Sequence, residues 1–146
     1  MLIERREKAM IDFIELLYRQ HKHLRQMAEM MWNENNDLHI TSSEWFVLKN
    51  IYEGYVTVPE LVKQLDISKQ GVHKFVTSLQ EKELITTELI KGSKVQKMAH
   101  LTEKGIIIFN ESKKMELEIE KMVRDTIGDK EYEMLLEMLK KPLLKI

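Results

Sequence analysis

Residues 57–102 constrain the fold most, because two adjacent amphipathic helix patterns are followed there by two strand-like runs. Thr57, followed three residues later by Glu60, is typical of a capping box, and Pro59 fits the first turn of a helix that begins near Val58. The stretch therefore predicts a short helix, a second helix and then a β-hairpin.

The second helix pattern has one apolar face and one polar face. Ser68 is a favourable N-cap residue. The residues expected to face the core are Val72, Phe75, Val76 and Leu79, and those expected to face outward are Lys69, Gln70, His73, Lys74 and Thr77. The DNA major groove admits a helix and offers base edges and phosphates that such side chains bind. Any surface helix also has a polar outer face, so this pattern alone leaves both interpretations open.

A β-hairpin is expected after this helix. β-branched residues between Ile85 and Ile90 favour a strand, Gly92 supplies a turn, and the alternation from Val95 onward predicts a returning strand. A lone hairpin is unstable in water, so it must pack on the helices. Its tip carries Lys91, Lys94 and Lys97, which can reach phosphates. Helix, helix and β-ribbon is the order of a winged helix-turn-helix.

The sequence resembles the MarR family of bacterial transcriptional regulators. The resemblance rests on VPELVKQLDIS, on KQGVHKFVTSLQEKELI, and on the LTEKG of residues 101–105. It implies a mainly α fold: a winged helix-turn-helix with a small β-hairpin wing and long N- and C-terminal dimerisation helices. It also implies a homodimer that binds a pseudo-palindromic operator in double-stranded DNA, with residues 69–82 in the major groove.

Two positions depart from the family pattern. Many members carry Asp-x-Arg at the wing, with the arginine in the minor groove, and these positions fall on Ser93, Lys94 and Val95. The arginine's role is therefore not transferred, and Lys94 or Lys91 has to supply a weaker contact. Glu83 stands where the family usually has glycine. A left-handed conformation at Glu83 costs about 1 kcal/mol or more.

Long helix patterns flank the winged region. We expect a single domain over residues 1–146, with residues 1–35 and 103–146 forming the helical dimerisation region and residues 41–102 the DNA-binding region. One helix pattern spans residues 4–34 with no clear capping residue. Its apolar stripe contains Met10, Phe13, Ile14, Leu17, Leu24, Met27 and Met31.

Cap signals delimit the other helices. Thr41 with Glu44 is a second capping box, and Gly54 ends the helix that it opens. Thr102 caps a helix that runs to about residue 127, and Asp129 is expected to cap the last one. Because the winged region cannot cover all the apolar surface of these helices, we expect an obligate two-fold dimer through residues 1–17 and 106–146.

Charge is distributed unevenly along the chain. The formal net charge is −1, which by itself does not suggest a DNA-binding protein. Residues 67–102 nevertheless hold six lysines against three glutamates, while the segments before and after them are acidic on balance. The positive charge is thus concentrated where DNA contact is expected, and a modest salt dependence follows.

Several classes of protein are excluded or disfavoured. The absence of cysteine excludes disulfides, thiolate zinc sites and thiol redox sensing. There is no phosphate loop, nucleophile elbow or His-Glu-x-x-His, so neither an enzyme nor a cofactor is expected. A metal site from His21, His23, Glu29 and His39 is less favoured than solvated helix residues. Without a long apolar run or a signal-peptide core, we expect a cytoplasmic protein with no membrane partner.

Two further expectations concern regulation. The resemblance implies a cleft, between the dimerisation helices and the winged region, that binds a small aromatic or amphipathic effector. The candidate lining residues are Arg19, His23, Met27, Met31, Trp45 and Phe109, although such residues at helical spacing also suit a core. A repressor is expected, because the chain offers no spare domain for recruiting polymerase. The alternative is a helical dimeric protein-interaction module that has lost specific DNA binding.

Overall fold

The computed structural model describes residues 12–145. Its elements are α2 (Phe13–Asn35), α3 (Ser42–Glu53), α4 (Val58–Leu65), α5 (Lys69–Glu81), β1 (Ile85–Leu89), β2 (Lys97–Leu101), α6 (Glu103–Ile127) and α7 (Asp129–Leu139). The predicted fold class, mainly α with a winged helix-turn-helix and a small hairpin, is confirmed. The expected helix start near residue 4, Met10 of the apolar stripe and the dimer contacts of residues 1–11 lie outside the described residues.

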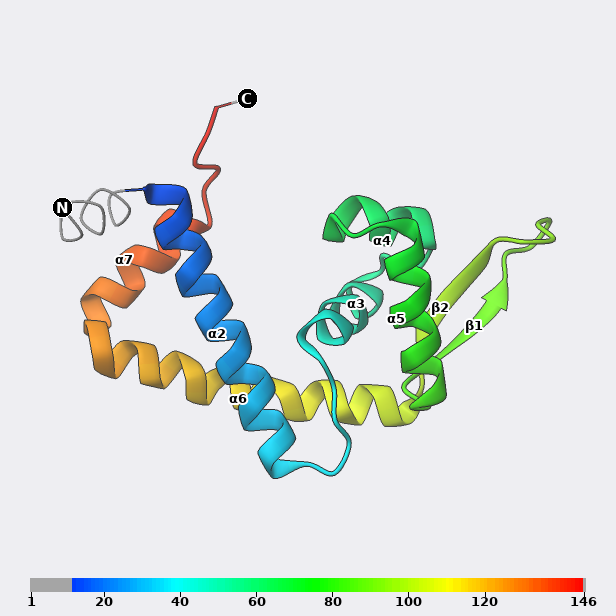
Figure 1. Cartoon of the computed structure of the whole chain (residues 1–146), viewed down its shortest axis with the longest axis horizontal. Coiled ribbons are helices and arrows are strands. Elements are labelled where there is room, and N and C mark those ends of the chain that lie inside the picture. Colours follow the sequence, from blue (N-terminus) through cyan, green and yellow to red (C-terminus); the bar gives the residue numbers. More distant parts are fainter. Residues whose placement is uncertain (1–11, 146) are drawn as a thin grey trace, which may run out of the picture.

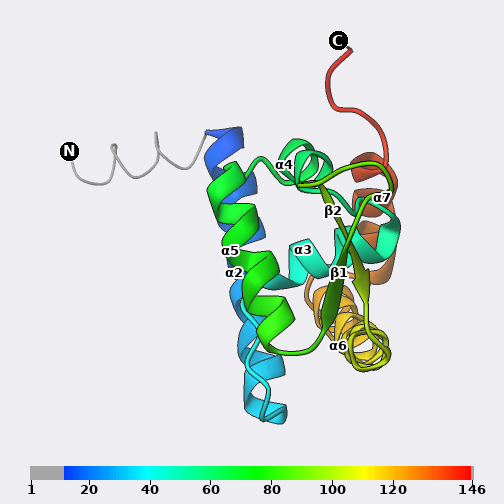
Figure 2. The same cartoon turned by 90° about the vertical axis from the view of Figure 1, so that its right-hand side faces the viewer.

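Helix α6 runs along the length of the molecule and connects its two ends (Figure 1). Helices α3, α4 and α5 and the hairpin lie over the N-terminal part of α6. Helix α7 and the first turns of α2 lie at the other end, and α2 crosses α6 between the two groups. Seen from the wing side, α5 and the hairpin stand next to each other at the front (Figure 2). These two elements therefore contribute to the same face of the molecule.

Local sequence signals open and close the helices of the winged region. The capping box of α3 is complete: Glu44 N donates to Thr41 Oγ1 at 3.2 Å, and Thr41 N donates to Glu44 Oε1 at 3.0 Å. Gly54 ends α3 with a φ of 107°. Thr57 caps α4 by accepting from Glu60 N at 3.3 Å, but the Glu60 carboxylate accepts from the Thr57 hydroxyl instead of its N–H. The second predicted box is thus half formed.

Two helix starts differ from the sequence-based expectation. The N-cap of α2 is Asp12, whose carboxylate accepts hydrogen bonds from two first-turn N–H groups at 3.0 and 3.3 Å. Aspartate is a favourable N-cap type, so the sequence itself contains a signal for this helix start. Asp129, predicted to cap α7, is the first residue of that helix; Gly128 is the N-cap and makes no side-chain cap bond. Asp129 lies instead 3.7 Å from the guanidinium of Arg124.

The core of the winged region is formed by aliphatic side chains from all its helices and from β1. Its fully buried members are Ile40, Val47, Leu48, Leu61, Val72, Leu79, Leu84 and Ile85. Strand β1 pairs antiparallel with β2, with Ile85 opposite Leu101 and Leu89 opposite Lys97. The N–H of Ala99 donates to the carbonyl of Val56 at 2.9 Å, so one hydrogen bond joins the segment before α4 to the other edge of β2. The hairpin is thereby held against the helix pair.

A buried ion pair joins α3 to the end of α5. Glu44 is 3% exposed, and both of its carboxylate oxygens accept from Lys82 Nζ, at 2.7 and 2.8 Å. Ser78 Oγ donates to the same carboxylate at 2.9 Å. Burial alone would raise the pKa of Glu44, but the hydrogen bonds from Lys82, Thr41 and Ser78 together hold that pKa below its usual value. Helix α5 is therefore anchored at its C-terminal turn.

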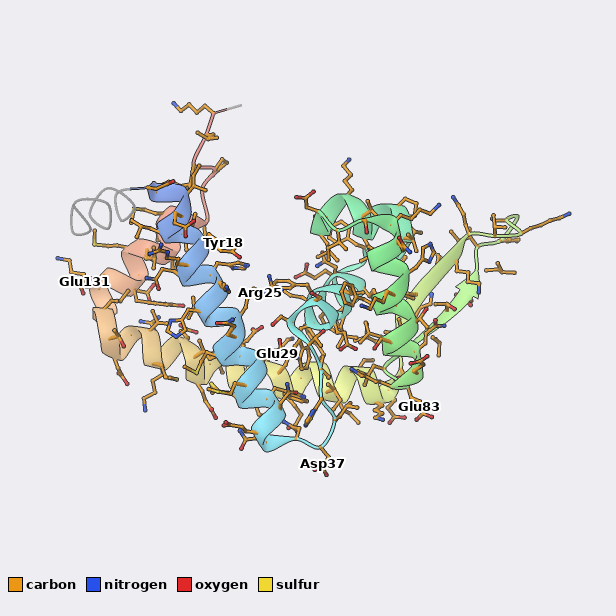
Figure 3. All side chains as sticks on the ribbon, viewed as in Figure 1. Tyr18, Arg25, Glu29, Asp37, Glu83 and Glu131 are labelled. Carbon is orange, nitrogen blue, oxygen red and sulfur yellow. The ribbon has the colours of Figure 1, made fainter. Side chains whose placement is uncertain are left out.

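Glu83 has a φ of 62° and thus adopts the left-handed conformation at the turn between α5 and β1 (Figure 3). Its carbonyl accepts from the hydroxyl of Thr102 at 2.7 Å, so the surrounding structure maintains the strain. We expect Glu83→Gly to raise the free energy of unfolding by about 0.5–1 kcal/mol, because glycine removes the steric cost of this conformation. Urea denaturation measures the change. Glu81→Gly, at the last residue of α5, is the control and should destabilise the protein; an equal loss at both positions would contradict the argument.

Candidate nucleic-acid interface

The N-terminal half of α5 is presented to solvent by its cap and by its buried face. Ser68 Oγ accepts from Gly71 N at 3.0 Å, which fixes the start of the helix. Val72, Val76 and Leu79 are buried, so the opposite face has to point outward. The five residues predicted to lie on that face are all exposed: Lys69, Gln70, His73, Lys74 and Thr77. Their side chains are therefore free to meet a partner.

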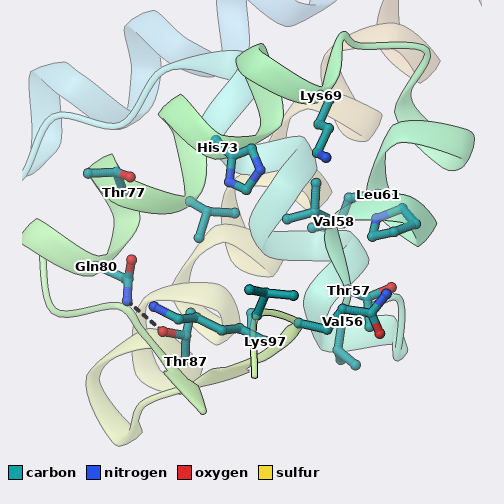
Figure 4. Close-up of a pocket in the computed structure, with 15 residues that line it drawn as sticks. Val56, Thr57, Val58, Leu61, Lys69, His73, Thr77, Gln80, Thr87 and Lys97 are labelled. Atoms are coloured by element: carbon teal, nitrogen blue, oxygen red, sulfur yellow. Dashed lines mark hydrogen bonds between the residues drawn. The ribbon is translucent and has the colours of Figure 1, made fainter. Parts of the chain in front are cut away.

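These exposed side chains divide into two rows along α5. Lys69, His73 and Thr77 turn toward the wing, where they line a groove between α5, β2 and the start of α4 (Figure 4). Gln70 and Lys74 are exposed but do not line that groove, so they occupy the face that points away from the core. One helix thus offers an amide and an ammonium outward and a row of polar groups toward the wing.

The tip of the wing is a closed turn stabilised by its own hydrogen bonds. Ser93 Oγ accepts from the N–H groups of Val95 and Gln96 at 3.3 and 2.9 Å, and Ile90 N donates to Gln96 O at 2.9 Å. Val95, at the position where the family often has arginine, lies in this turn and is 83% exposed. The returning strand therefore begins at Lys97, two residues later than the alternation predicted.

Of the three lysines predicted at the tip, Lys91 and Lys94 are exposed there, whereas the placement of Lys97 at the tip was wrong. Lys97 lies further down, on β2, and lines the groove. His100, also on β2, pairs with Glu88 of β1 at 3.0 Å. The wing thus carries its cations in two places, at the tip and beside α5.

A small cavity lies between α2, α3 and α6, in the region where an effector cleft is expected from the sequence. It measures about 140 Å³, and Trp45 and Phe109 line it. Arg25 and Glu29, which follow Tyr18 along α2 (Figure 3), line it as well. The other four predicted lining residues, Arg19, His23, Met27 and Met31, are not among those that line it.

Several residues that line this cavity carry polar groups. The Glu29 carboxylate accepts from both the N–H and the hydroxyl of Ser42, at 3.0 and 2.8 Å, and so connects α2 to the first turn of α3. Within residues 12–145, the buried Nε of Arg25 and Nε1 of Trp45 have no hydrogen-bond partner. Unpaired buried donors are uncommon in folded proteins. The residues that line the cavity thus include aromatic side chains and two side chains with an unpaired buried N–H.

Two negative findings apply to the residues that the structure describes. Between residues 12 and 145, no group of three or more histidine, aspartate or glutamate side chains is arranged to hold a metal ion. None of the described helices is long and apolar enough to cross a membrane.

Comparison with known proteins relates this geometry to solved structures. Residues 39–94 match the MarR family, whereas no curated protein sequence matches the chain. Wild-type apo MarR from E. coli superposes with a TM-score of 0.80 at 18% identity, covering 92% of this chain and 98% of the other. A MarR mutant in complex with operator DNA gives 0.77 at 18% identity, with 92% and 96% covered. The S. aureus MepR–DNA complex gives 0.69 at 21% identity, with 86% and 91% covered.

Proposed function

We propose, from the match of residues 39–94 to the MarR family, that the chain is a transcription regulator that binds double-stranded DNA sequence-specifically. The observation that carries this proposal is the exposed polar face of α5 beside a lysine-bearing wing. Solved structures of the same fold from E. coli and S. aureus contain DNA. In this proposal the chain is a single domain, in which residues 41–102 bind DNA and residues 1–35 and 103–146 form the dimer.

In the proposed complex, α5 enters the major groove. Gln70 and Lys74 meet base edges there, with Thr77 one turn further along. Ser68 and the first N–H groups of α5 lie where a phosphate would accept hydrogen bonds. Lys91 and Lys94 contact the backbone or the minor groove from the wing. Two-fold symmetry sets the half-sites about one helical turn, roughly 10 bp, apart.

Gln70→Ala should weaken operator binding by about 1–3 kcal/mol and relax the preference at one base position, because the amide pairs with a base edge. Lys94→Ala is the matched control: it should weaken binding to all sequences alike and flatten the salt dependence. Fluorescence anisotropy against the operator and its single-base variants distinguishes the two effects. If Gln70→Ala bound the operator as tightly as wild type, the proposed placement of α5 would be wrong.

The proposed dimer uses the apolar side chains at the end of the molecule opposite the wing. Exposed side chains there include Phe13, Ile14, Leu17, Met134, Leu135, Met138, Leu139, Leu143 and Leu144. An apolar surface of this kind on a soluble protein usually marks an interface. Near α7, the guanidinium of Arg124 stacks 4.2 Å above the Tyr132 ring and pairs with Glu133, which fixes α7 against α6. A two-fold contact through α7 and α2 would cover this surface.

Wild-type protein should be a dimer at micromolar concentration. Met138→Lys with Leu139→Lys should shift it toward monomer, because two charges would be buried without partners. Light scattering measures both masses. Leu89→Lys, an equally exposed apolar position on β1, is the control and should leave the mass of the dimer unchanged. A wild-type protein that scatters as a monomer would refute the dimer.

The regulator is proposed to act as a repressor that a small aromatic or amphipathic molecule releases. The support is the cavity between α2, α3 and α6, with its unpaired Trp45 Nε1 and Arg25 Nε. At about 140 Å³ it is smaller than usual ligand sites, which measure about 300–1,000 Å³. A ligand would therefore have to separate α3 from α2 on entry. Such a movement would reorient α5, which Glu44 anchors to α3.

A protein-interaction module is the second candidate. It is favoured by the exposed Val95 at the wing tip, where many family members have a DNA-binding arginine. Selection of bound fragments from a random duplex library at roughly physiological salt distinguishes the two functions. A triple variant, Lys69→Ala with Gln70→Ala and Lys74→Ala, is the control. Enrichment of a pseudo-palindrome by wild type alone supports the regulator. Equal, weak binding by both proteins without enrichment supports the interaction module.

A further inference from the structure

The groove between α5 and β2 is electropositive. It measures about 530 Å³, and Lys69 and His73 line it from α5 while Lys97 lines it from β2. Among residues 12–145, no aspartate or glutamate lines it, although the chain has 24 acidic residues. Like charges that converge on a concave surface raise the local concentration of oppositely charged partners. The charge of the groove therefore favours an anion.

The lysine and histidine side chains of the groove are available for binding. Within residues 12–145, Lys69, His73 and Lys97 make no side-chain hydrogen bond or ion pair. Figure 4 shows the Lys69 side chain and the His73 ring extending from α5 into the groove and Lys97 extending along it from β2. By contrast, Gln80 Nε2 donates to Thr87 Oγ1 at 2.9 Å, which closes the end of the groove near the foot of the hairpin. The side chains without hydrogen-bond partners, Lys69, His73 and Lys97, thus line the part of the groove away from this bond.

The floor of the groove is apolar. Val58, Leu61, Val76 and Ala99 also line it, and the last three of these are buried. An anion with a carbon framework suits this combination better than a small inorganic ion, because the floor offers a small ion no hydrogen bond. The sugar–phosphate backbone of DNA has this composition, with charged oxygens on one side and deoxyribose carbons on the other. About 530 Å³ is within the range that accommodates ligands larger than a single phosphate.

We propose that this groove binds the sugar–phosphate backbone that runs between the major groove entered by α5 and the minor groove reached by the wing. One phosphodiester lies among Lys69, His73 and Lys97, and its sugars rest on the apolar floor. The inference rests on the proposed function and deepens it. Lys97 becomes a DNA-binding residue, Lys69 and His73 bind phosphate instead of base edges, and Gln70 and Lys74 are left to read sequence.

Lys97→Met tests the assignment, because it removes the charge and keeps most of the aliphatic side chain. Binding to a mixed-sequence duplex and to the selected operator is measured between about 50 and 200 mM salt. For each half-site, the slope of log K against log salt should become shallower by about 1, equally on both duplexes. Lys114→Met, an exposed position on α6 outside the groove, is the control for net charge and should leave the slope unchanged. An unchanged slope for Lys97→Met would overturn the assignment.

A methylphosphonate scan identifies the phosphate itself. Each backbone phosphate of the operator, or of the mixed-sequence duplex if no operator is found, is replaced in turn by its neutral analogue. At one position per half-site, wild type should lose affinity while Lys97→Met loses no more. If the affinity losses from the neutral phosphate and from Lys97→Met were additive at every position, the contact would be refuted. If wild type enriches no sequence but Lys97→Met still flattens the salt slope, sequence-specific regulation fails and the backbone contact stands; if wild type binds no duplex at all, both fail.

Discussion

Replacing Glu44 by alanine should lower the free energy of unfolding by about 2–4 kcal/mol, because the change removes hydrogen bonds to a charged group at a buried position. Glu44 is 3% exposed and accepts from Lys82, Ser78 and the N–H of Thr41. The loss should be visible in urea denaturation and should also weaken DNA binding, since the end of α5 loses its anchor. Glu15→Ala, which removes an exposed pair with Arg19, is the control and should cost about 0.5 kcal/mol or less. Similar losses for both variants would contradict a special role for Glu44.

The same carboxylate should contribute to acid unfolding. Its pKa is lower in the folded protein than its usual value, so the unfolded chain binds the proton more tightly. The stabilisation is therefore complete above the unfolded pKa, about 4.3, and is lost as the pH falls through the folded pKa. Glu44→Gln, which cannot titrate, should show a flatter decline of stability with falling pH. A decline as steep as that of wild type would assign acid unfolding to other carboxylates.

Gly105→Ala should destabilise the protein by about 2–3 kcal/mol, because the added methyl group cannot be accommodated without moving the backbone. A Cβ at Gly105 would lie 2.1 Å from the carbonyl oxygen of Leu84, which already accepts from Thr102 N at 3.0 Å. At an ordinary helix position the same change would stabilise the protein by about 1 kcal/mol, so the sign of the effect is diagnostic. Thermal or urea unfolding measures it.

Asn110→Ala, an exposed change on the same helix, is the control for Gly105→Ala. It should be neutral or slightly stabilising, because alanine is the better helix former. If Gly105→Ala behaved like this control, the close contact between α6 and Leu84 would have no energetic importance.

Helix boundaries and the wing could be predicted from the sequence because their signals are local. Thr41, Ser68 and Thr102 each cap a helix through a side-chain bond to an N–H three residues away, and such pairs can be read without knowing the fold. Asp12, the N-cap of α2, is a comparable local signal. The role of Gly105 could not be derived, because its neighbour Leu84 belongs to another element.

The candidate site could be predicted from the sequence only in part. The polar face of α5 follows from helical periodicity, which separates outward from inward residues but does not give the position of β2. The division between the Lys69 row and the Gln70 row, and the position of Lys97, depend on that strand. The second role of Glu44 was equally hidden, since its partners Ser78 and Lys82 are 34 and 38 residues away.

Helix α6 continues without interruption from Glu103 to Ile127, which has a mechanical consequence. At 1.5 Å per residue it is about 37 Å long, so a small tilt at its α7 end would produce a larger displacement at the hairpin. A tilt of about 10° displaces the far end by about 6 Å, close to the rise of two base pairs at about 3.4 Å each. In the proposed dimer, the half-site spacing that is bound would then depend on the angle between the two α6 helices. Affinity for operators lengthened by one or two base pairs would therefore measure the conformation of the protein.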